Sequence, residues 1–271
     1  MPHSAEYLCP ICRLSLQKQA NSYTCQNAHN FDIAKQGYVN LLPVQQKKTK
    51  NPGDNKLMIK ARQAFLEKAY YDFLIEPCIQ LIQKHCKENA KLLDIGCGEG
   101  YFTQHVFRKI NYHLAYGFDI SKEALKIAAK RDSNIYWFVA SSKEIPLEQN
   151  SLDAILKINI PTRLENISPY LTEKGIIISV TPGENHLHGL KELIYKEPKK
   201  HQAEPPIDGH VIIDQTLVEN ALSLDNNQDI KNLLFMTPYA WNIPKTVQQV
   251  IEGLDTLETS IAFQINVWQK Q

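Results

Sequence analysis

The sequence lacks any uninterrupted apolar run of the roughly 18 or more residues that a membrane-spanning helix needs. Its first residues also lack a basic stretch followed by an apolar one, so no secretory signal is visible. The net charge is only +1, which by itself neither favours nor excludes a nucleic acid as a partner. We therefore expect a cytoplasmic protein, and its 271 residues can bury one large core plus a small satellite.

Cysteine is scarce, with 6 residues in the chain, and half of them belong to one short pattern. Two residues separate Cys9 from Cys12, and three separate Cys25 from His29. Three thiolates and an imidazole are ligands that a tetrahedral zinc ion takes, and the 12 residues between the pairs can form a hairpin. Four ligands leave no position for a substrate water, so the pattern predicts a structural zinc site. A disulfide, or four unrelated residues, is the alternative.

Basic side chains are concentrated between residues 45 and 68, where they outnumber the acidic ones. They are Lys47, Lys48, Lys50, Lys56, Lys60, Arg62 and Lys68. The first three precede a turn signal at residues 51–54, and the spacing of apolar residues then predicts a helix over residues 55–66. A basic loop beside a zinc module suits contacts with RNA phosphates, whereas a solvated linker is the alternative.

A second pattern begins with the short apolar strand 92–95, which is followed by Gly96, Gly98 and Gly100 and then by a helix that starts near Tyr101. Glycines allow a tight strand-to-helix turn and a close approach of a ligand to the backbone. A second strand, 115–118, leads to Asp119, about 20 residues past the glycines. A carboxylate at this position can accept hydrogen bonds from ribose hydroxyls. The pattern therefore predicts a site for an adenosine-containing cofactor.

The spacing of the glycines favours S-adenosylmethionine (SAM) over NAD. A dinucleotide site has Gly-x-Gly-x-x-Gly, whereas this chain has Gly-x-Gly-x-Gly after the acidic residue Asp94. SAM has no pyrophosphate but carries an ammonium and a sulfonium group, which a carboxylate such as Asp94 suits. NAD, or a glycine turn without a ligand, remains the alternative.

The rest of the chain alternates between strands and helices as a doubly wound α/β sheet does. We expect strands at 136–140, 152–158 and 175–181, helices at 122–130 and 186–195, and a loop or insertion at 196–208. Ser141 follows the third strand, in the crevice where open α/β sheets bind ligands. Residues 229–236 and 260–268 are predicted to be the last two strands, paired as an antiparallel hairpin at the edge.

Several longer runs match one protein family. They are Cys9-Pro10-x-Cys12, Asn21-Ser22-Tyr23-x-Cys25-x-x-x-His29-x-Phe31-Asp32, Ala34-Lys35-x-Gly37-Tyr38-Val39-Asn40-Leu41-Leu42-Pro43, Pro52-Gly53-Asp54, Leu93-Asp94-Ile95-Gly96-Cys97-Gly98-Glu99-Gly100-Tyr101, Thr181-Pro182-Gly183, His186-Leu187 and Met236-Thr237-Pro238-x-Ala240-Trp241. With these runs the chain resembles the large-subunit ribosomal RNA guanine-N1-methyltransferases of the RlmA type. The zinc pattern and the run ending at Pro43 are the family-specific parts, since many methyltransferases share the glycine turn.

The resemblance implies a Rossmann-like class I SAM-dependent methyltransferase with a seven-stranded sheet and a small zinc-binding module. It places the module at residues 1–43, a basic linker and helix at 44–66, and the methyltransferase domain at 67–271. The implied reaction is methylation of N1 of one guanine in a hairpin of 23S ribosomal RNA, and a homodimer is compatible with it. The family's zinc ligands fall on Cys9, Cys12, Cys25 and His29, and its cofactor contacts on Tyr71, Gly98, Glu99 and His186.

Guanine N1 carries a proton that must leave before methyl transfer, so some group has to accept it or stabilise the resulting anion. We expect Asn159, at the carboxyl end of the fourth strand, to lie beside the acceptor base, and Asp72 is a candidate proton acceptor. Two other classes remain open. One is a SAM-dependent methyltransferase of a small molecule, which has no need of a zinc module. The other is a non-catalytic zinc-containing RNA-binding protein, which has no need of a complete cofactor turn.

Overall fold

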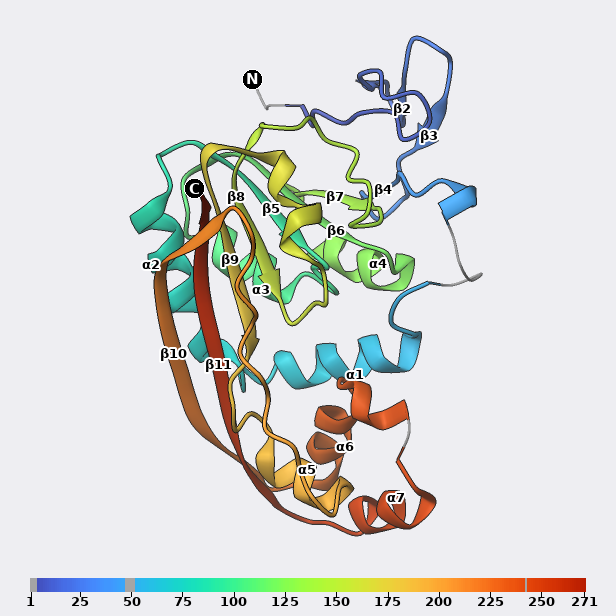
Figure 1. Cartoon of the computed structure of the whole chain (residues 1–271). Coiled ribbons are helices and arrows are strands. Elements are labelled where there is room, and N and C mark those ends of the chain that lie inside the picture. Colours follow the sequence, from blue (N-terminus) through green and yellow to red (C-terminus); the bar gives the residue numbers. More distant parts are fainter. Residues whose placement is uncertain (1–3, 47–51, 242) are drawn as a thin grey trace.

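The computed structural model describes residues 4–46, 52–241 and 243–271. Its larger sheet has the strand order β10-β11-β9-β8-β5-β6-β7-β4, and a small separate sheet has the order β1-β2-β3 (Figure 1). The strands are β1 (Gln17–Lys18), β2 (Ser22–Thr24), β3 (Asn30–Asp32), β4 (Val39–Asn40), β5 (Ala90–Ile95), β6 (Tyr112–Asp119), β7 (Tyr136–Val139), β8 (Leu152–Ile158), β9 (Leu171–Pro182), β10 (His210–Leu224) and β11 (Leu257–Lys270).

The helices pack mainly against one face of the larger sheet. They are α1 (Lys56–Leu66), α2 (Ile75–His85), α3 (Tyr101–Phe107), α4 (Lys122–Arg131), α5 (His188–Ile194), α6 (Asn227–Phe235) and α7 (Lys245–Glu252). Short 3-10 segments are η1 (Val44–Gln46), η2 (Asp72–Leu74), η3 (Leu164–Asn166), η4 (Ser168–Tyr170) and η5 (Pro238–Trp241). Among the described residues, no helix is long and apolar enough to cross a membrane.

The central strands β4 to β9 of the larger sheet are parallel, and β10 and β11 pair antiparallel at one edge. Leu93 lies beside Tyr116 on β6 and Ile155 on β8, and Ile155 lies beside Ile177 on β9. This register aligns the carboxyl ends of the strands, where open α/β sheets bind ligands. The seven strands expected for a class I methyltransferase are present, and β4 adds an eighth from the N-terminal region.

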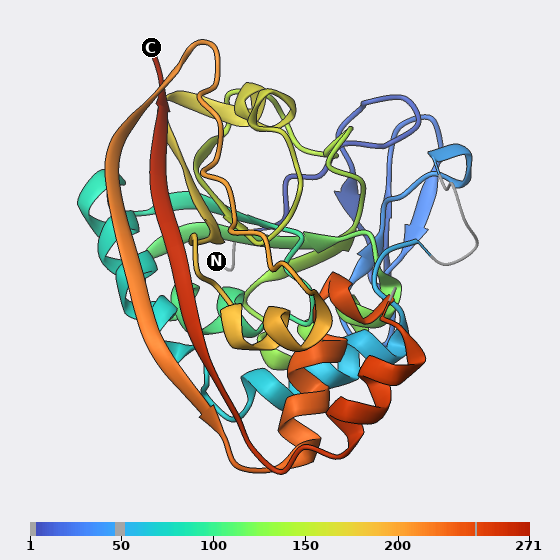
Figure 2. The same cartoon turned by 60° about the horizontal axis from the view of Figure 1, so that its bottom comes forward.

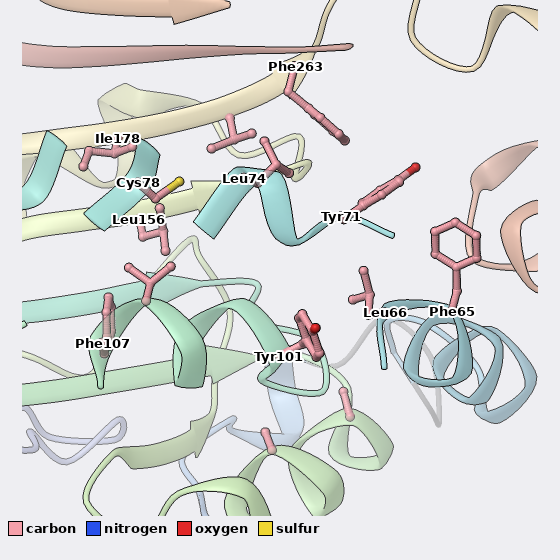
Figure 3. Packing of buried hydrophobic residues seen from close by; sticks show 14 of the residues in the cluster. Phe65, Leu66, Tyr71, Leu74, Cys78, Tyr101, Phe107, Leu156, Ile178 and Phe263 are labelled. Carbon is pink, nitrogen blue, oxygen red and sulfur yellow. The ribbon is translucent and has the colours of Figure 1, made fainter. Parts of the chain in front are cut away.

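One core lies between the sheet and the helices, and includes Phe65, Tyr71, Leu74, Phe107 and Phe263 (Figure 3). Because both faces of the central strands are buried, these strands carry continuous apolar runs rather than alternating ones. Helix α1 packs beside α6 near the bottom of the molecule, as the turned view also shows (Figure 2). This contact brings a helix from the start of the chain against one from its last fifth.

The second face of the sheet is covered by the N-terminal region and by η3 and η4. Tyr7 is only 2% exposed, and its ring lies 5.0 Å from that of Tyr23, 5.9 Å from that of Tyr116 and 5.3 Å from that of Phe138, measured between centroids. Tyr23 belongs to the small sheet, whereas Tyr116 and Phe138 lie on β6 and β7. The small sheet and the large one therefore share a core, and β4 also pairs directly with β7.

The structure corrects one expectation about the C-terminal third. Residues 229–236, predicted as a strand, belong to helix α6, because Asn226 caps its first turn by accepting from the Asp229 N–H at 2.9 Å and Ile230, Leu233 and Leu234 follow at helical spacing. The hairpin partner of β11 is β10 instead, whose alternately exposed residues are typical of an edge strand. The domain boundaries at 43/44 and 66/67 stay predictions.

Replacing Tyr7 with Ala should destabilise the whole chain, because the ring joins the two sheets. We expect a loss of about 3–5 kcal/mol in the free energy of unfolding, the usual range for removing a large buried aromatic ring. Urea denaturation followed by circular dichroism measures this. Ile11→Ala is the matched control, because Ile11 is 60% exposed. A Tyr7→Ala protein as stable as the wild type would show that the shared core contributes little.

Candidate active site and metal centre

The predicted zinc ligands come together. One ligand atom from each of Cys9, Cys12, Cys25 and His29 lies within 4.8 Å of all the others. The Cys9 Sγ atom lies 3.4 Å from His29 Nδ1, and the Sγ atoms of Cys12 and Cys25 lie 3.7 Å apart. Three sulfurs and one imidazole nitrogen gathered around one point form a closed, four-coordinate donor set for zinc. The donor set therefore fits a structural metal ion.

Tight turns hold these ligands in place. The Arg13 N–H donates to the Cys9 carbonyl at 2.8 Å, and the Ala28 N–H donates to that of Cys25 at 2.9 Å. A backbone hydrogen bond at Leu14 lowers the pKa of the Cys12 thiol to about 6, which favours the thiolate that a metal requires. Arg13 then docks the turn onto the loop between β7 and β8, because its guanidinium donates to the carbonyls of Ile145 at 3.1 Å and of Leu147 at 3.0 Å.

A cavity of about 580 Å³ lies at the carboxyl ends of β5, β8 and β9, bordered by α1. Six of the predicted site residues line it: Tyr71, Asp94, Gly96, Glu99, Asn159 and His186. The other five do not border this cavity: Asp72, Gly98, Gly100, Asp119 and Ser141. The glycine turn and the end of the fourth strand, far apart in the chain, thus contribute to one hollow.

The glycine turn is tightly packed against this cavity. Gly96 has a φ of +64°, and a Cβ atom added there would lie 2.6 Å from Ile160 Cγ2, so only glycine fits. The Gly98 N–H donates to Asp119 Oδ2 at 3.1 Å, and the Ser121 N–H donates to Asp119 Oδ1 at 2.7 Å. Asp119 therefore ties the turn to the end of β6, and burial raises the pKa of its carboxyl group.

Asp94 is a buried carboxyl group on the cavity wall, with 2% of its surface exposed. Its Oδ2 atom accepts a hydrogen bond from Thr103 Oγ1 at 2.5 Å, and burial raises its pKa to about 7. A cationic ligand group beside it would favour the ionised form and recover the cost of burying the charge.

Two buried polar atoms in the cavity wall lack a hydrogen-bond partner among the described residues: the Tyr71 hydroxyl and Glu99 Oε1. Each residue is 2% exposed, and burial raises the pKa of both. Glu99 Oε1 has only a long contact, 3.9 Å, with Arg131 Nη2. Since buried polar groups are nearly always paired in native proteins, these two atoms point to a polar ligand in the cavity. Their position fits the predicted cofactor contacts.

His186 is a neutral ring at the back of the cavity, because burial lowers its pKa to about 3. Its Nδ1 atom accepts from the Ala262 N–H at 3.3 Å, so the ring proton resides on Nε2. The loop 196–208 adds His201, whose ring centroid lies 6.0 Å from that of His186. That loop is anchored through Glu204, which pairs with the buried Lys157 Nζ at 3.0 Å.

The predicted catalytic residues differ in their surroundings. Asn159 directly follows β8, has a φ of +52° and lines the cavity. Asp72 lies outside the lining, and its Oδ1 atom accepts from the Tyr101 hydroxyl at 2.6 Å. Tyr101 itself borders the cavity. Ser141 accepts from the Lys143 N–H at 3.3 Å and so closes a turn after β7.

Sequence reasoning missed several residues that border the cavity. Arg62 was noted only as part of a basic segment, although it reaches over the glycine turn. Other lining residues are Met58, Thr181, Pro182, Met236, Thr237, Pro238 and Tyr239. The runs Thr181-Pro182-Gly183 and Met236-Thr237-Pro238, quoted above for the family resemblance, were the signal that could have placed these two segments at the site.

Comparisons with known proteins agree with this arrangement. The family model "RlmA, N-terminal" matches residues 7–50, and a "Methyltransferase domain" model matches residues 92–172. YxjB of Bacillus subtilis (strain 168), which carries a provisional name as a 23S rRNA (guanine-N1)-methyltransferase, is 25% identical, with 97% of each chain covered. The 23S rRNA (guanine(748)-N(1))-methyltransferase of Streptomyces fradiae is 27% identical, over 86% of this chain and 85% of that protein. The metal and the cofactor of the two sites are thus zinc and SAM.

We predict one zinc ion per chain, and Cys25→Ser should lose most of it, because three ligands no longer close the tetrahedron. Metal content after gel filtration, measured by mass spectrometry, tests this. Cys86→Ser is the control, since Cys86 lies outside the cluster. Equal zinc content in Cys25→Ser and wild type would exclude this residue as a ligand.

SAM affinity should fall as the pH drops below about 7. Asp94 has a raised pKa in the ligand-free cavity, so at lower pH its proton must leave before the carboxylate can face a cation. The dissociation constant should therefore rise by up to about tenfold per pH unit below 7 and level off above it. Burial raises the pKa of Glu99 and Asp119 in the same sense.

Calorimetric titrations between pH 6 and pH 8.5 measure this profile. Asp94→Asn should bind SAM more weakly at every pH and lose most of the slope. A flat wild-type profile would mean that Asp94 stays ionised in the free protein or does not face the cofactor.

Proposed function

We propose that this chain, which belongs to the RlmA family of SAM-dependent methyltransferases, methylates N1 of a guanine in a hairpin of 23S ribosomal RNA. The observation that carries the proposal is the similarity to guanine-N1-methyltransferases along nearly the whole chain, zinc module and cofactor domain together. A methyltransferase of small molecules has no use for a zinc module that shares a core with its catalytic sheet. The expected cytoplasmic location and homodimer remain predictions.

When bound, SAM supplies an electrophilic methyl group. The protein's task is to present guanine N1 to that methyl group and to manage the N1 proton. N1 is hidden in a base pair, so the target must be unpaired or flipped out of its helix. The cavity offers aromatic surface for such a base at Phe102, Tyr101 and Tyr239.

Asn159 is the residue we assign to the acceptor base. Asn159 borders the cavity at the carboxyl end of β8, and its side-chain amide N–H can donate to guanine O6. Negative charge collects on O6 as N1 loses its proton, so such a donor stabilises the reacting form of the base. Asp72 is the candidate proton acceptor, acting through the Tyr101 hydroxyl that it binds. His186, held neutral, is assigned to cofactor binding.

A methyl-transfer assay tests the proposal. Labelled SAM is incubated with 23S ribosomal RNA that lacks its modifications, and the product is mapped by mass spectrometry. We expect a single 1-methylguanine. Asn159→Ala should lower turnover at saturating SAM by roughly 100-fold, as loss of one donor to a developing oxyanion does elsewhere.

Three results would contradict parts of this proposal. No incorporation into RNA, with SAM binding intact, would favour a small-molecule substrate, and failure to bind SAM would favour a non-catalytic RNA-binding protein. Unchanged turnover in Asp72→Ala would remove Asp72 from the mechanism without affecting the assigned substrate.

A further inference from the structure

The cavity contains an unusual distribution of charge. Among the described residues that line it, Asp54, Asp94 and Glu99 are acidic, and Arg62 is the one lysine or arginine. The two histidines do not supply positive charge, since burial lowers the pKa of His186 to about 3 and also lowers that of His201. A ligand with both cationic and anionic groups therefore meets several carboxylates but a single permanent cation.

SAM is such a ligand. Its ammonium and sulfonium groups are cationic, and its methionine part ends in a carboxylate. The carboxyl groups of Asp94 and Glu99 can match the two cations, whereas Asp54 is already paired with Arg62. The carboxylate needs a positively charged donor, because burying an unpaired anion is costly.

Arg62 is well placed to be that donor. It lies in the second half of α1, a helix whose first turn Asn55 caps by accepting from the N–H groups of Leu57 at 2.9 Å and Met58 at 3.0 Å. A Cβ atom added to Gly98 would lie 3.4 Å from Arg62 Nη1, so the guanidinium lies against the cofactor turn.

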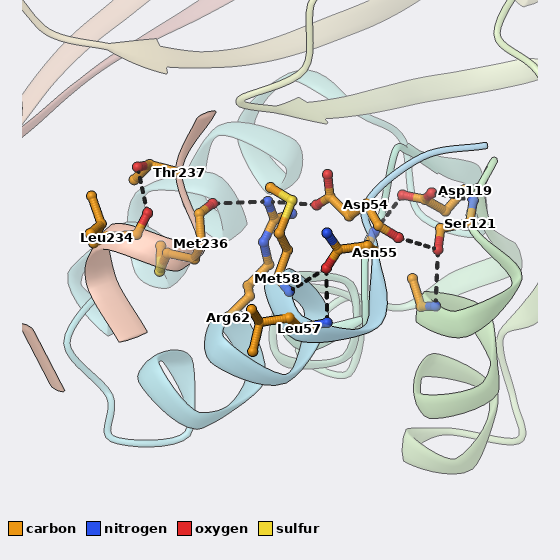
Figure 4. Close-up of polar contacts among 12 residues, drawn as sticks. Asp54, Asn55, Leu57, Met58, Arg62, Asp119, Ser121, Leu234, Met236 and Thr237 are labelled. Atoms are coloured by element: carbon orange, nitrogen blue, oxygen red, sulfur yellow. Dashed lines mark hydrogen bonds and ion pairs between the residues drawn. The ribbon is translucent and has the colours of Figure 1, made fainter. Parts of the chain in front are cut away.

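Arg62 contacts Asp54 and the Met236 carbonyl (Figure 4), and a ligand could replace these partners. Its Nη2 atom lies 3.0 Å from Asp54 Oδ2 and donates to the Met236 carbonyl at 3.3 Å. Both contacts use the same nitrogen, whereas Nη1 faces Gly98. The side chains of Arg62 and Asp54 are 30% and 36% exposed, so the ion pair between them is half-solvated and contributes little stability.

A hydrogen bond to its backbone carbonyl holds Asp54 in place independently of its side chain. Its carbonyl accepts from Ser121 Oγ at 3.1 Å, beside the end of β6. The Asp54 carboxylate can therefore release the guanidinium without loosening the chain around it.

We propose that Arg62 binds the carboxylate of the SAM methionine group and exchanges its ion pair with Asp54 for this contact. The inference rests on the SAM-dependent function proposed above and adds a residue that sets the cofactor's orientation. A guanidinium can bind a carboxylate through two parallel N–H donors, which fixes direction as well as charge. Helix α1 follows the zinc module in the chain, packs against α6, and contacts the carbonyl of Met236 just after α6 through Arg62. A cofactor bound to Arg62 would therefore touch a side chain that links three parts of the protein.

Decarboxylated SAM, which keeps the sulfonium and the amine, provides the test. Dissociation constants for SAM and for this analogue are measured by calorimetry with wild-type protein, Arg62→Met and Asp54→Asn. Wild type should bind SAM about 10- to 100-fold more tightly than the analogue, the factor expected for a charge-assisted hydrogen bond. Arg62→Met should weaken SAM binding by about that factor and leave binding of the analogue nearly unchanged, so this variant should no longer prefer SAM.

Three further variants separate this role from a structural one. Asp54→Asn removes the competing carboxylate and should bind SAM as tightly as wild type or more so. Lys60→Met removes an exposed cation from the same helix and should leave both constants unchanged. Arg62→Lys keeps the charge and should retain part of the preference for SAM.

Three results would overturn the proposal. If Arg62→Met weakened the binding of SAM and of the analogue equally, the side chain would only stabilise the fold. If Asp54→Asn lost as much SAM affinity as Arg62→Met, the effect would come from the ion pair itself. Unchanged SAM binding with reduced RNA methylation would assign Arg62 to the RNA. Since the titrations contain no RNA, they stand even if the proposed RNA substrate is wrong.

Discussion

The pairing of β4 with β7 is the constraint on which the arrangement of both sites depends. It is only two residues long, yet it makes a strand from the zinc-binding region an edge of the catalytic sheet. Tyr7 and its aromatic neighbours then fill the face that would otherwise need a covering helix. A small module that cannot build a core alone thereby obtains one from the larger sheet, and zinc fixes the shape of its outer end.

Helix α1 borders the cavity at the carboxyl ends of the parallel strands and packs against α6. Gly53 sits against the end of β6, because a Cβ atom added to it would lie 2.8 Å from Ile120 Cγ2. The cavity is thus bordered partly by α1, a helix that does not directly follow any of the strands β5, β8 and β9 that end there. Its walls join the start, the middle and the end of the sequence.

The zinc ligands and the glycine turn could be predicted because each lies within one short segment. Residues 9–29 hold all four zinc ligands and residues 94–100 hold the whole glycine turn, so each spacing is visible in the sequence. The chemistry of the side chains then indicates which ligand each site binds. The hairpin partner of β11 was missed because β10 is an edge strand in which most apolar side chains, such as Val211, Ile212 and Leu217, are exposed and only Leu222 and Leu224 at its end are buried. Helix α6 was misassigned because its short apolar run outweighed the capping signal of Asn226.

Arg62 could not have been placed from the sequence, since its surroundings come from three distant segments. The lysine- and arginine-rich stretch predicts contacts with RNA phosphates or a solvated linker. Lys47, Lys48 and Lys50 lie outside the described residues, and Lys56, Lys60 and Lys68 are exposed. What singles out Arg62 is geometric: the helical register turns Met58, Arg62 and Leu66 inward together, so one cation enters a cavity whose other charges are acidic. An arginine there remains charged however the cavity is filled, whereas the histidines opposite lose their charge through burial. The partner that the cofactor's carboxylate would replace is partly exposed, because the Asp54 side chain keeps 36% of its surface in solvent beside Arg62 Nη2 at 3.0 Å.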